Sequence, residues 1–268
     1  MNTLFKTEEG SIIEEERAGQ NNLKIITANG LKAIAMVTML IDHMAVALPM
    51  PYFLYGLLRF TGRIAAPILF FFIAEGYHHT GNKNKYMMRL AAFAAVSYIP
   101  FVWFMKGNLP NGNNWLTLNV IYTLLIGFLA LRAKREIEQP WLKTTVILVL
   151  LWLSLPGDWS YLAVLYILAF DHFRGDFKKQ AYAYCAITLI SMIPELSYPI
   201  VCLLNSQPMI KQNLAIGIIN LGRFLPIGLL YLYNGQKGGG GKWAQWGFYV
   251  FYPFHLIILC IIRSLLNG

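Results

Sequence analysis

Long uninterrupted apolar segments restrict the fold of this chain more than any other feature. We count nine of them in the 268 residues, and most have about the length of a helix that crosses a bilayer. They cover residues 30–49, 57–78, 86–106, 115–132, 141–156, 159–172, 180–204, 213–234 and 246–266. Apolar residues run continuously through them, whereas the strands of an outer-membrane barrel alternate in polarity. The sequence therefore predicts an all-α, polytopic transmembrane helical bundle of about nine spans.

The low content of charged residues supports this fold class. Only 13% of the residues are charged, against about 25% in a soluble domain. The fifth and sixth segments are short and flank Pro156-Gly157-Asp158. We expect them to form either a tight helical hairpin or a partly re-entrant pair.

Basic residues are concentrated in every second loop of the predicted bundle. They are Lys24 and Lys32 before the first span, then Lys83, Lys85, Arg89, Arg132, Lys134, Arg135, Lys143, Arg174, Lys178, Lys179, Lys237 and Lys242 in alternate loops. Positive residues gather in cytoplasmic loops, so this alternation predicts a cytoplasmic N-terminus and an external C-terminus. The basic residues that give the net charge of +9 lie in these loops. Their distribution therefore indicates the lipid bilayer as a partner and excludes nucleic acid.

Residues 1–25 differ from the remainder of the chain. They include the glutamates Glu8, Glu9, Glu14, Glu15 and Glu16, and we expect an acidic cytoplasmic tail rather than a signal peptide. Residues 26–268 then form a single transmembrane domain. The cysteines Cys185, Cys202 and Cys260 each lie in an apolar run without a CxxC spacing, which predicts buried thiols.

Ionisable residues inside apolar segments mark the candidate site, because charges are costly in hydrocarbon and usually serve a function. Asp42 and His43 lie near the middle of the first span and could supply proton-transfer chemistry. Arg59 and Arg63 are four residues apart and share one helix face, which suits an anion. We expect Arg63 to lie at depth, whereas Arg59 snorkels to the outer interface.

Other spans contribute further polar residues at depth. Arg223 lies in mid-span and Glu195 follows Pro194, so the two either pair with each other or face a cavity. His255 follows Pro253, which perturbs the helix, and it is either a second candidate base or a packed, hydrogen-bonded histidine.

Two positions near the ends of spans complete the set. Glu75 precedes His78 and His79 by three and four residues, which permits an ion pair or hydrogen bond with either. Asp158 lies at the tip of the short hairpin, where it is solvated or faces a vestibule. The histidines lie on different spans without an H-x-x-x-H pair, so no metal site is predicted.

The segments that carry these residues resemble the TraX family, which is named for the protein that acetylates the N-terminus of F-type pilin. The matching segments are LKAIAMVTMLIDH (31–43), GRIAAPILFFFIAEGYHHT (62–80), NVIYTLLIG (119–127), GDWSYLAVLY (157–166) and FYPFHLIIL (251–259). They follow in the same order over nearly all of the chain. The resemblance implies an integral membrane acyltransferase that uses acetyl-CoA, located in the cytoplasmic membrane of a bacterium.

Acyl transfer is the leading hypothesis, and it gives each candidate residue a role. His43 is the general base that deprotonates an acceptor amine or hydroxyl, with Asp42 in support and His255 as the second candidate base. Arg63, Arg223 and Glu75 are assigned to the acetyl-CoA donor, and Asp158, Tyr161, Glu195 and Asn119 to the acceptor. Acetyl-CoA is cytoplasmic, so we expect a cavity that admits its pantetheine arm from the basic cytoplasmic face.

The chain departs from the family pattern at one place, and for this reason the acceptor is not carried over with the rest of the resemblance. The third span usually reads S-E-I-P-F-D, whereas residues 97–102 here are S-Y-I-P-F-V and lack both acids. The acceptor is therefore left open as a protein N-terminus, a peptide or a cell-surface glycan. A proton-coupled transporter is the alternative function, although we detect no convincing internal repeat. A non-catalytic scaffold for surface assembly is the third.

Overall fold

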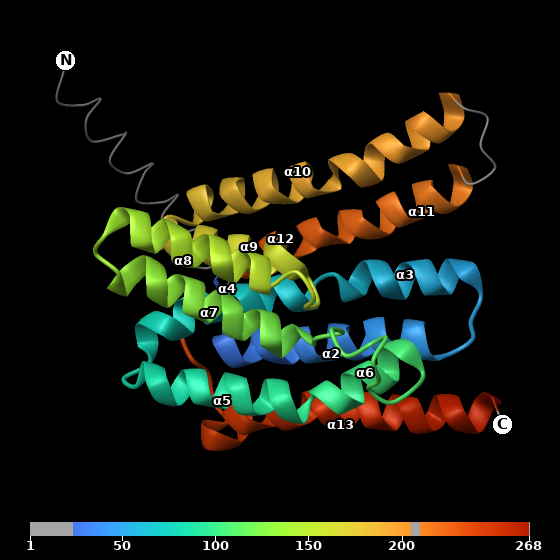
Figure 1. The fold of residues 1–268 in the computed structure, drawn as a ribbon, viewed down its shortest axis with the longest axis horizontal. Helices are drawn as coiled ribbons and strands as arrows, with labels where there is room; N and C mark the ends of the chain where they lie inside the picture. The colour runs from blue at the N-terminus through green and yellow to red at the C-terminus, as the bar shows by residue number, and fades with distance from the viewer. Residues whose placement is uncertain (1–23, 205–209, 268) are drawn as a thin grey trace, which may run out of the picture.

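The computed structural model describes residues 24–204 and 210–267, and its regular elements in these ranges are all helices. In chain order they are α2 (Ala28–Ala47), α3 (Tyr52–Gly62), α4 (Ala65–His79), α5 (Lys83–Val96), α6 (Tyr98–Lys106), α7 (Val120–Glu136), α8 (Pro140–Leu153), α9 (Ser160–His172), α10 (Phe177–Leu204), α11 (Ile210–Leu221), the 3-10 helix η1 (Gly222–Phe224), α12 (Leu225–Tyr231) and α13 (Gly241–Asn267) (Figure 1). They follow the predicted apolar segments closely. The protein is an all-α helical membrane bundle, as the sequence predicts.

The helices run along the long axis of the molecule with their turns at its two ends (Figure 1). The turns α4–α5, α7–α8 and α9–α10 lie at one end, and the α2–α3 turn lies at the other. Three of the basic loops therefore share one end. Which end faces the cytoplasm stays a prediction.

Few of the described helices are long enough to cross a bilayer individually. Three segments qualify by length and composition, namely 28–47, 52–79 and 246–266, and α5 with α6 makes a fourth if its 42° bend is accepted. With 14 and 13 residues, α8 and α9 are about 20 Å long, against a hydrocarbon core of about 30 Å. The number of spans thus stays a prediction.

The predicted hairpin of α8 and α9 is present, and its loop is fixed against the start of α7. The N–H of Asp158 donates to the carbonyl of Leu118 (2.9 Å), and the hydroxyl of Thr123 donates to the carbonyl of Asp158 (2.8 Å). A side chain at position 157 would collide with Thr123, so the close approach requires glycine. These contacts hold the loop at a defined depth inside the bundle.

Two helices that run in the same direction are interrupted near their middle (Figure 1). One break separates α3 from α4, and the other is η1 between α11 and α12. The breaks pack together so closely that a side chain at Gly222 would collide with the backbone of Phe60. Both carry a Gly-Arg pair followed by proline, in GRIAAP (62–67) and GRFLP (222–226). Two arginines are therefore held beside each other at depth.

The central element is α4. Eleven of its 15 residues are buried, and it contacts α2, α7, α9 and α12. A helix that is apolar on all sides packs best in the interior of a bundle, where neighbours cover every face. Because α4 begins at one of the breaks, its first turn adjoins the polar residues at depth.

Candidate active site

Two histidines from distant parts of the chain form the centre of the site. The ring nitrogens Nδ1 of His43 and Nε2 of His255 lie 2.7 Å apart, and the rings stack with their centroids 5.0 Å apart. His43 lies on α2 and His255 on α13, two helices that pack together. Their exposed fractions are only 9% and 4%, so water hardly reaches this hydrogen bond.

The backbone fixes the hydrogen positions in this pair. Nδ1 of His255 lies 2.8 Å from the carbonyl oxygen of Phe251. A carbonyl only accepts, so Nδ1 of His255 carries the hydrogen, and in a neutral ring Nε2 is then an acceptor. His43 must donate from its own Nδ1. Its remaining nitrogen, Nε2, therefore bears a lone pair that can take a proton.

The neighbouring carboxylate is bonded by an arginine of α3. Nη1 of Arg59 donates to Oδ2 of Asp42 at 2.6 Å. The expectation that Arg59 snorkels away was wrong, because α2 and α3 pack tightly. A side chain at Gly62 would overlap Asp42, and this glycine lets the carboxylate lie between the helices.

A small cavity of about 30 Å³ lies beside these groups. Its wall includes Asp42, His43, Arg63, Asp158, Trp159 and Tyr252. Arg63 stands at the break between α3 and α4, within the electrostatic reach of Asp42 and Asp158. The structure thus brings together four of the predicted site residues at one point, namely Asp42, His43, Arg63 and Asp158, with His255 hydrogen-bonded to His43. The volume is enough for a water or a similarly small group, since one water needs about 10–15 Å³.

The backbone at the edge of the cavity is unusual. Trp159 and Ser160 both adopt positive φ, at 63° and 47°, and Trp159 lines the cavity. Such angles are uncommon for residues other than glycine and cluster at functional sites when the surroundings enforce them. Here the clamped α8–α9 loop enforces them.

The second arginine lies close by, behind the tryptophan. Arg223 is 9% exposed, its guanidinium lies 5.6 Å from the ring of Trp159, and Nη1 donates to Oγ of Ser191 (3.3 Å). Glu195 is on α10, but its side chain lies outside the described residues. The predicted pair of Arg223 with Glu195 therefore stays a prediction.

Two residues assigned to the acceptor have other surroundings. Asn119 is the N-cap of α7: its carbonyl accepts from the N–H of Tyr122 (3.1 Å), and its amide donates to the carbonyl of Ala94 (2.8 Å). These bonds explain its burial by structure alone. Tyr161 is 44% exposed on the first turn of α9 and is not among the described residues that line the cavity.

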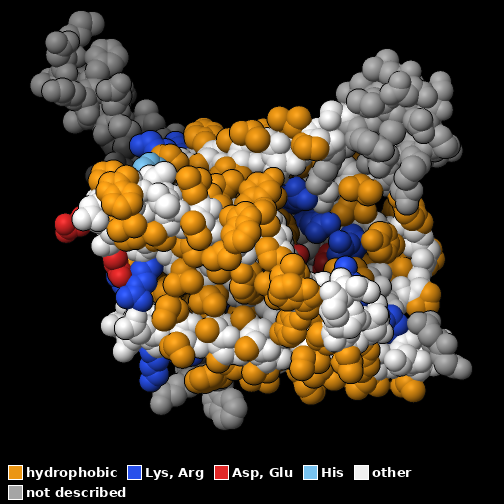
Figure 2. Space-filling view, viewed as in Figure 1, with side chains coloured by type: hydrophobic (Ala, Val, Ile, Leu, Met, Phe, Trp, Pro, Cys, Tyr) orange, Lys and Arg blue, Asp and Glu red, His pale blue; other side chains and the backbone are white. Residues whose placement is uncertain are grey.

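The site is accessible from the surface. Figure 2 shows basic and acidic side chains gathered in a hollow of a face that is otherwise largely hydrophobic, beside α3 and α11. The side chains of Arg59 and Asp42 retain 19% and 16% of their surface. Charged groups at membrane depth usually face the interior of the bundle or a water-filled cavity.

A second and larger pocket of about 410 Å³ opens toward the end that holds the basic loops. It lies between α2, α4, α5, α13 and the loop 232–240. Its polar lining includes Lys32, Glu75, Tyr86, Arg89, Lys237 and Tyr249. Glu75, which we assigned to the donor, thus lies at this pocket and apart from the histidine pair.

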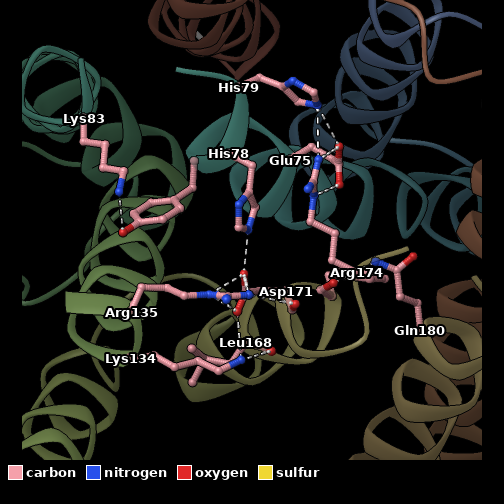
Figure 3. Close-up of polar contacts among 12 residues, drawn as sticks. Glu75, His78, His79, Lys83, Lys134, Arg135, Leu168, Asp171, Arg174 and Gln180 are labelled. Atoms are coloured by element: carbon pink, nitrogen blue, oxygen red, sulfur yellow. Dashed lines mark hydrogen bonds and ion pairs between the residues drawn. The ribbon is translucent and has the colours of Figure 1, made fainter. Parts of the chain in front are cut away.

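The ion pairs at this end fix the helices that frame the pocket (Figure 3). Glu75 bonds Arg174 (2.9 Å) and His79 (3.2 Å), so of its two predicted histidine partners only His79 is found. His78 instead contacts Asp171 at 2.8 Å. Figure 3 shows Lys134 and Arg135 converging on the same buried carboxylate, each at 2.8 Å.

Sequence reasoning missed three residues of the site. Arg59 was separated from Arg63, although a spacing of four residues already placed them on one face. Tyr252 lies three residues before His255, a spacing that indicates a shared helix face. No sequence signal distinguishes Trp159 from the other tryptophans of the chain. In the part of the chain that the structure describes, no group of three potential ligands could hold a metal ion.

The fold and the site define a helical membrane protein with a buried histidine pair and arginines at helix breaks. The chain belongs to the TraX family: the family described as TraX protein matches residues 27–263. The chain is 30% identical over 246 residues to a probable fimbrial assembly protein, FimC of serogroup H1, from Dichelobacter nodosus. That alignment covers 88% of this chain and 96% of the relative. No solved structure matches. The family resemblance found in the sequence is thereby confirmed.

Proposed function

We propose that this protein is an integral membrane acetyltransferase that moves an acetyl group from acetyl-CoA to an amine or hydroxyl. The observation that carries the proposal is the buried hydrogen bond between His43 and His255 at the wall of a charged cavity. The pair leaves Nε2 of His43 as an acceptor, and a general base of this kind contributes about 10²–10⁴-fold to the rate.

The charged neighbours suit acyl transfer in particular. Arg59 bonds Oδ2 of Asp42, and Arg63 lies beside the cavity within the electrostatic reach of Asp42 and Asp158. A guanidinium is charged at any relevant pH and can stabilise the oxygen on which charge develops as a thioester is attacked. Asp158, on the same wall, is placed to accept a hydrogen from the acceptor group.

The 410 Å³ pocket suits the donor. Lys32, Arg89 and Lys237 give it positive charge for phosphates, and its size falls in the range of about 300–1,000 Å³ found for small-molecule sites. Leu69 and Leu124 line this pocket. They stand one helical turn, about 5.4 Å, from the layer that lines the cavity on α4 and α7.

The short distance between the pockets supports an inward route for the thioester. Ala66 and Val120 form the layer on the cavity side, and they precede Leu69 and Leu124 by three and four residues on the same helices. A slender pantetheine arm needs to cross only this layer to bring the acetyl group to His43. The phosphates stay at the basic end.

The proposed acceptor is the N-terminal amine of a pilin-like protein. The relative in Dichelobacter nodosus is named a probable fimbrial assembly protein, and the family is named for a pilin acetylation protein. A glycan hydroxyl is the second candidate acceptor. The coarser statement, a membrane protein that acts in the assembly of surface fibres, holds for either acceptor.

Thioester consumption by the purified protein tests the proposal. Wild-type protein with acetyl-CoA and a peptide that has a free N-terminus should release CoA thiol, whereas His43→Ala should not. His172→Ala is the matched control, because this exposed histidine ends α9 away from both pockets. Absence of CoA release from folded wild-type protein with both peptide and glycan acceptors would overturn the proposal.

A transporter is the second candidate, and the interrupted helices favour it. Many transporters place broken helices and charged residues at mid-membrane. The paired Gly-Arg breaks at Arg63 and Arg223 resemble this arrangement. Proton-coupled uptake into vesicles without thioester consumption would favour the transporter.

A further inference from the structure

Tyr252 is a further polar residue on the wall of the cavity. Tyr252 on α13 is fully buried and lines the cavity, and among the described residues its hydroxyl has no hydrogen-bond partner. Native proteins satisfy most buried polar groups, and the exceptions call for an explanation such as a catalytic role.

Two groups lie near this hydroxyl, the carboxylate of Asp158 on the same cavity wall and the backbone N–H of Val120, and neither makes a hydrogen bond to it. The backbone N–H of Val120 faces Tyr252 without reaching hydrogen-bond geometry. A backbone N–H can only donate, so even a closer approach would use a lone pair of the phenol oxygen. The O–H of Tyr252 would remain free to donate into the cavity.

A second hydrogen-bond donor belongs to a residue on the cavity wall. Nε of Arg63 is buried and, within the described ranges, unpaired. Tyr252 comes from α13 and Arg63 from the α3–α4 break, so two independent elements present unused donors to a space of about 30 Å³. Two donors on the wall of one small cavity suit a single oxygen that gains negative charge.

We propose that Tyr252 is a catalytic residue whose hydroxyl, together with Nε of Arg63, donates hydrogen bonds to the carbonyl oxygen of the bound thioester. This inference rests on the proposed acetyl transfer. It adds the groups that stabilise the oxyanion to the base that His43 supplies.

The chemistry balances with these groups. The acceptor nitrogen or oxygen bonds to the thioester carbonyl carbon, and its proton passes to Nε2 of His43. The carbonyl π electrons move to the oxygen, which accepts from Tyr252 and Arg63. When the C=O bond forms again, the C–S bond breaks, and the leaving CoA sulfur takes the proton from His43. Acetylated acceptor and free CoA thiol are the products.

The helix geometry supports a joint action of Tyr252 and the histidine pair. Tyr252 and His255 are three residues apart on α13, with ring centroids 5.7 Å apart. One helix therefore positions both the oxyanion donor and the ring that holds His43 in its tautomer. A shift of α13 would disturb both functions together.

Tyr252→Phe tests the proposal, because it removes one oxygen atom and keeps the ring. Loss of one oxyanion donor lowers kcat by about 10²–10³-fold, and we expect that loss here with little change in the KM for acetyl-CoA. The thermal midpoint in detergent should stay the same or rise, since an unsatisfied buried hydroxyl is removed.

Tyr166→Phe is the matched control. Tyr166 is equally buried, but its hydroxyl already pairs with Thr188 at 3.0 Å, and it is not among the described residues that line the cavity. It should lower the thermal midpoint and leave kcat near the wild-type value. The pair of variants separates loss of a working hydroxyl from loss of a structural one.

Three results would overturn the assignment of Tyr252. The first is a Tyr252→Phe protein with wild-type kcat. The second is a Tyr252→Phe protein whose activity falls only in proportion to a lowered thermal midpoint, because its hydroxyl would then be structural. The third is a folded wild-type protein without thioester turnover, which would overturn the proposed function and this inference together.

Discussion

The two histidines of the buried pair have different roles in the proposed chemistry. His43 lines the cavity, whereas His255 is bonded to the backbone and is not among the described residues that line it. His255 is therefore a positioning residue, and its expected role as a second base is not supported by its place. It keeps Nδ1 of His43 protonated and supports the positive charge that His43 gains.

This division predicts different losses for the two alanine variants. His43→Ala should lose nearly all activity, since a general base contributes about 10²–10⁴-fold. His255→Ala should lose less, because His43 keeps its base nitrogen but can adopt the wrong tautomer or orientation. Measured kcat values for both proteins, with His172→Ala as the control, decide this. Equal losses, or a larger loss for His255→Ala, would contradict the division of roles.

Arg63 gives the second prediction at this scale. Lysine preserves the charge but lacks the Nε donor and the planar guanidinium, so Arg63→Lys should lower kcat even where the protein is expressed normally. Arg59→Lys should have a smaller effect, because the contact of Arg59 with Asp42 uses one nitrogen at 2.6 Å and an ammonium can replace it. Unchanged kinetics in Arg63→Lys would return Arg63 to a structural role.

Single residues also show how much of the candidate site could be predicted from the sequence. Asp42, His43, Arg63 and His255 were identified because an ionisable side chain in an apolar segment is conspicuous without any knowledge of neighbours. The sequence could not decide between Arg59 and Arg63 as the partner of Asp42, because the choice depends on how α2 and α3 are rotated against each other. Asn119 was assigned to the acceptor from a matching segment, whereas its bonds cap a helix.

Two glycines of the same interrupted helix differ in how closely they approach a neighbouring helix. At Gly222 a side chain would meet the backbone of Phe60, which cannot move without shifting α3. At Gly228, on α12, a side chain would meet nothing within 4 Å. The two positions lie six residues apart in one interrupted helix and differ mainly in this contact.

Gly222→Ala should therefore destabilise the protein and lower its activity, because it separates the two breaks that hold Arg63 and Arg223. Gly228→Ala should be neutral or stabilising by up to about 1 kcal/mol, since alanine favours a helix more than glycine does. Thermal midpoints in detergent measure both effects. A Gly222→Ala protein as stable as Gly228→Ala would show that the breaks are not tightly packed.

Hydropathy predicted the positions of the helices well, but it missed the interruptions within them. Apolar runs located every helix to within a few residues, because burial in lipid or in the bundle selects the same residues. The breaks at η1 and after α3 were not predicted, since an apolar sequence reads the same through a straight helix and an interrupted one. The likeness of the two Gly-Arg segments is also too short to be recognised as a repeat without the structure.

The whole molecule places its two pockets toward opposite ends. The 410 Å³ pocket opens between helices at the end with the basic loops, and the charged hollow of Figure 2 lies beside α3, nearer the other end. A donor and an acceptor that approach from opposite sides of a membrane need this arrangement. It agrees with a cytoplasmic donor and an acceptor that emerges outside.

This arrangement predicts that acetyl-CoA acts from one side only. Acetyl-CoA does not cross a bilayer, so inside-out vesicles should consume it, whereas right-side-out vesicles should not until detergent opens them. Reporter fusions after Lys83, Lys134 and Lys178 should all read as cytoplasmic, which fixes the basic end independently.

Replacing Lys32 and Lys237 with glutamine should raise the KM for acetyl-CoA without lowering kcat. Lys106→Gln, exposed at the opposite end on α6, serves as the control. Consumption by sealed right-side-out vesicles would show that the donor approaches through the charged hollow, and the assignment of the larger pocket would then be wrong.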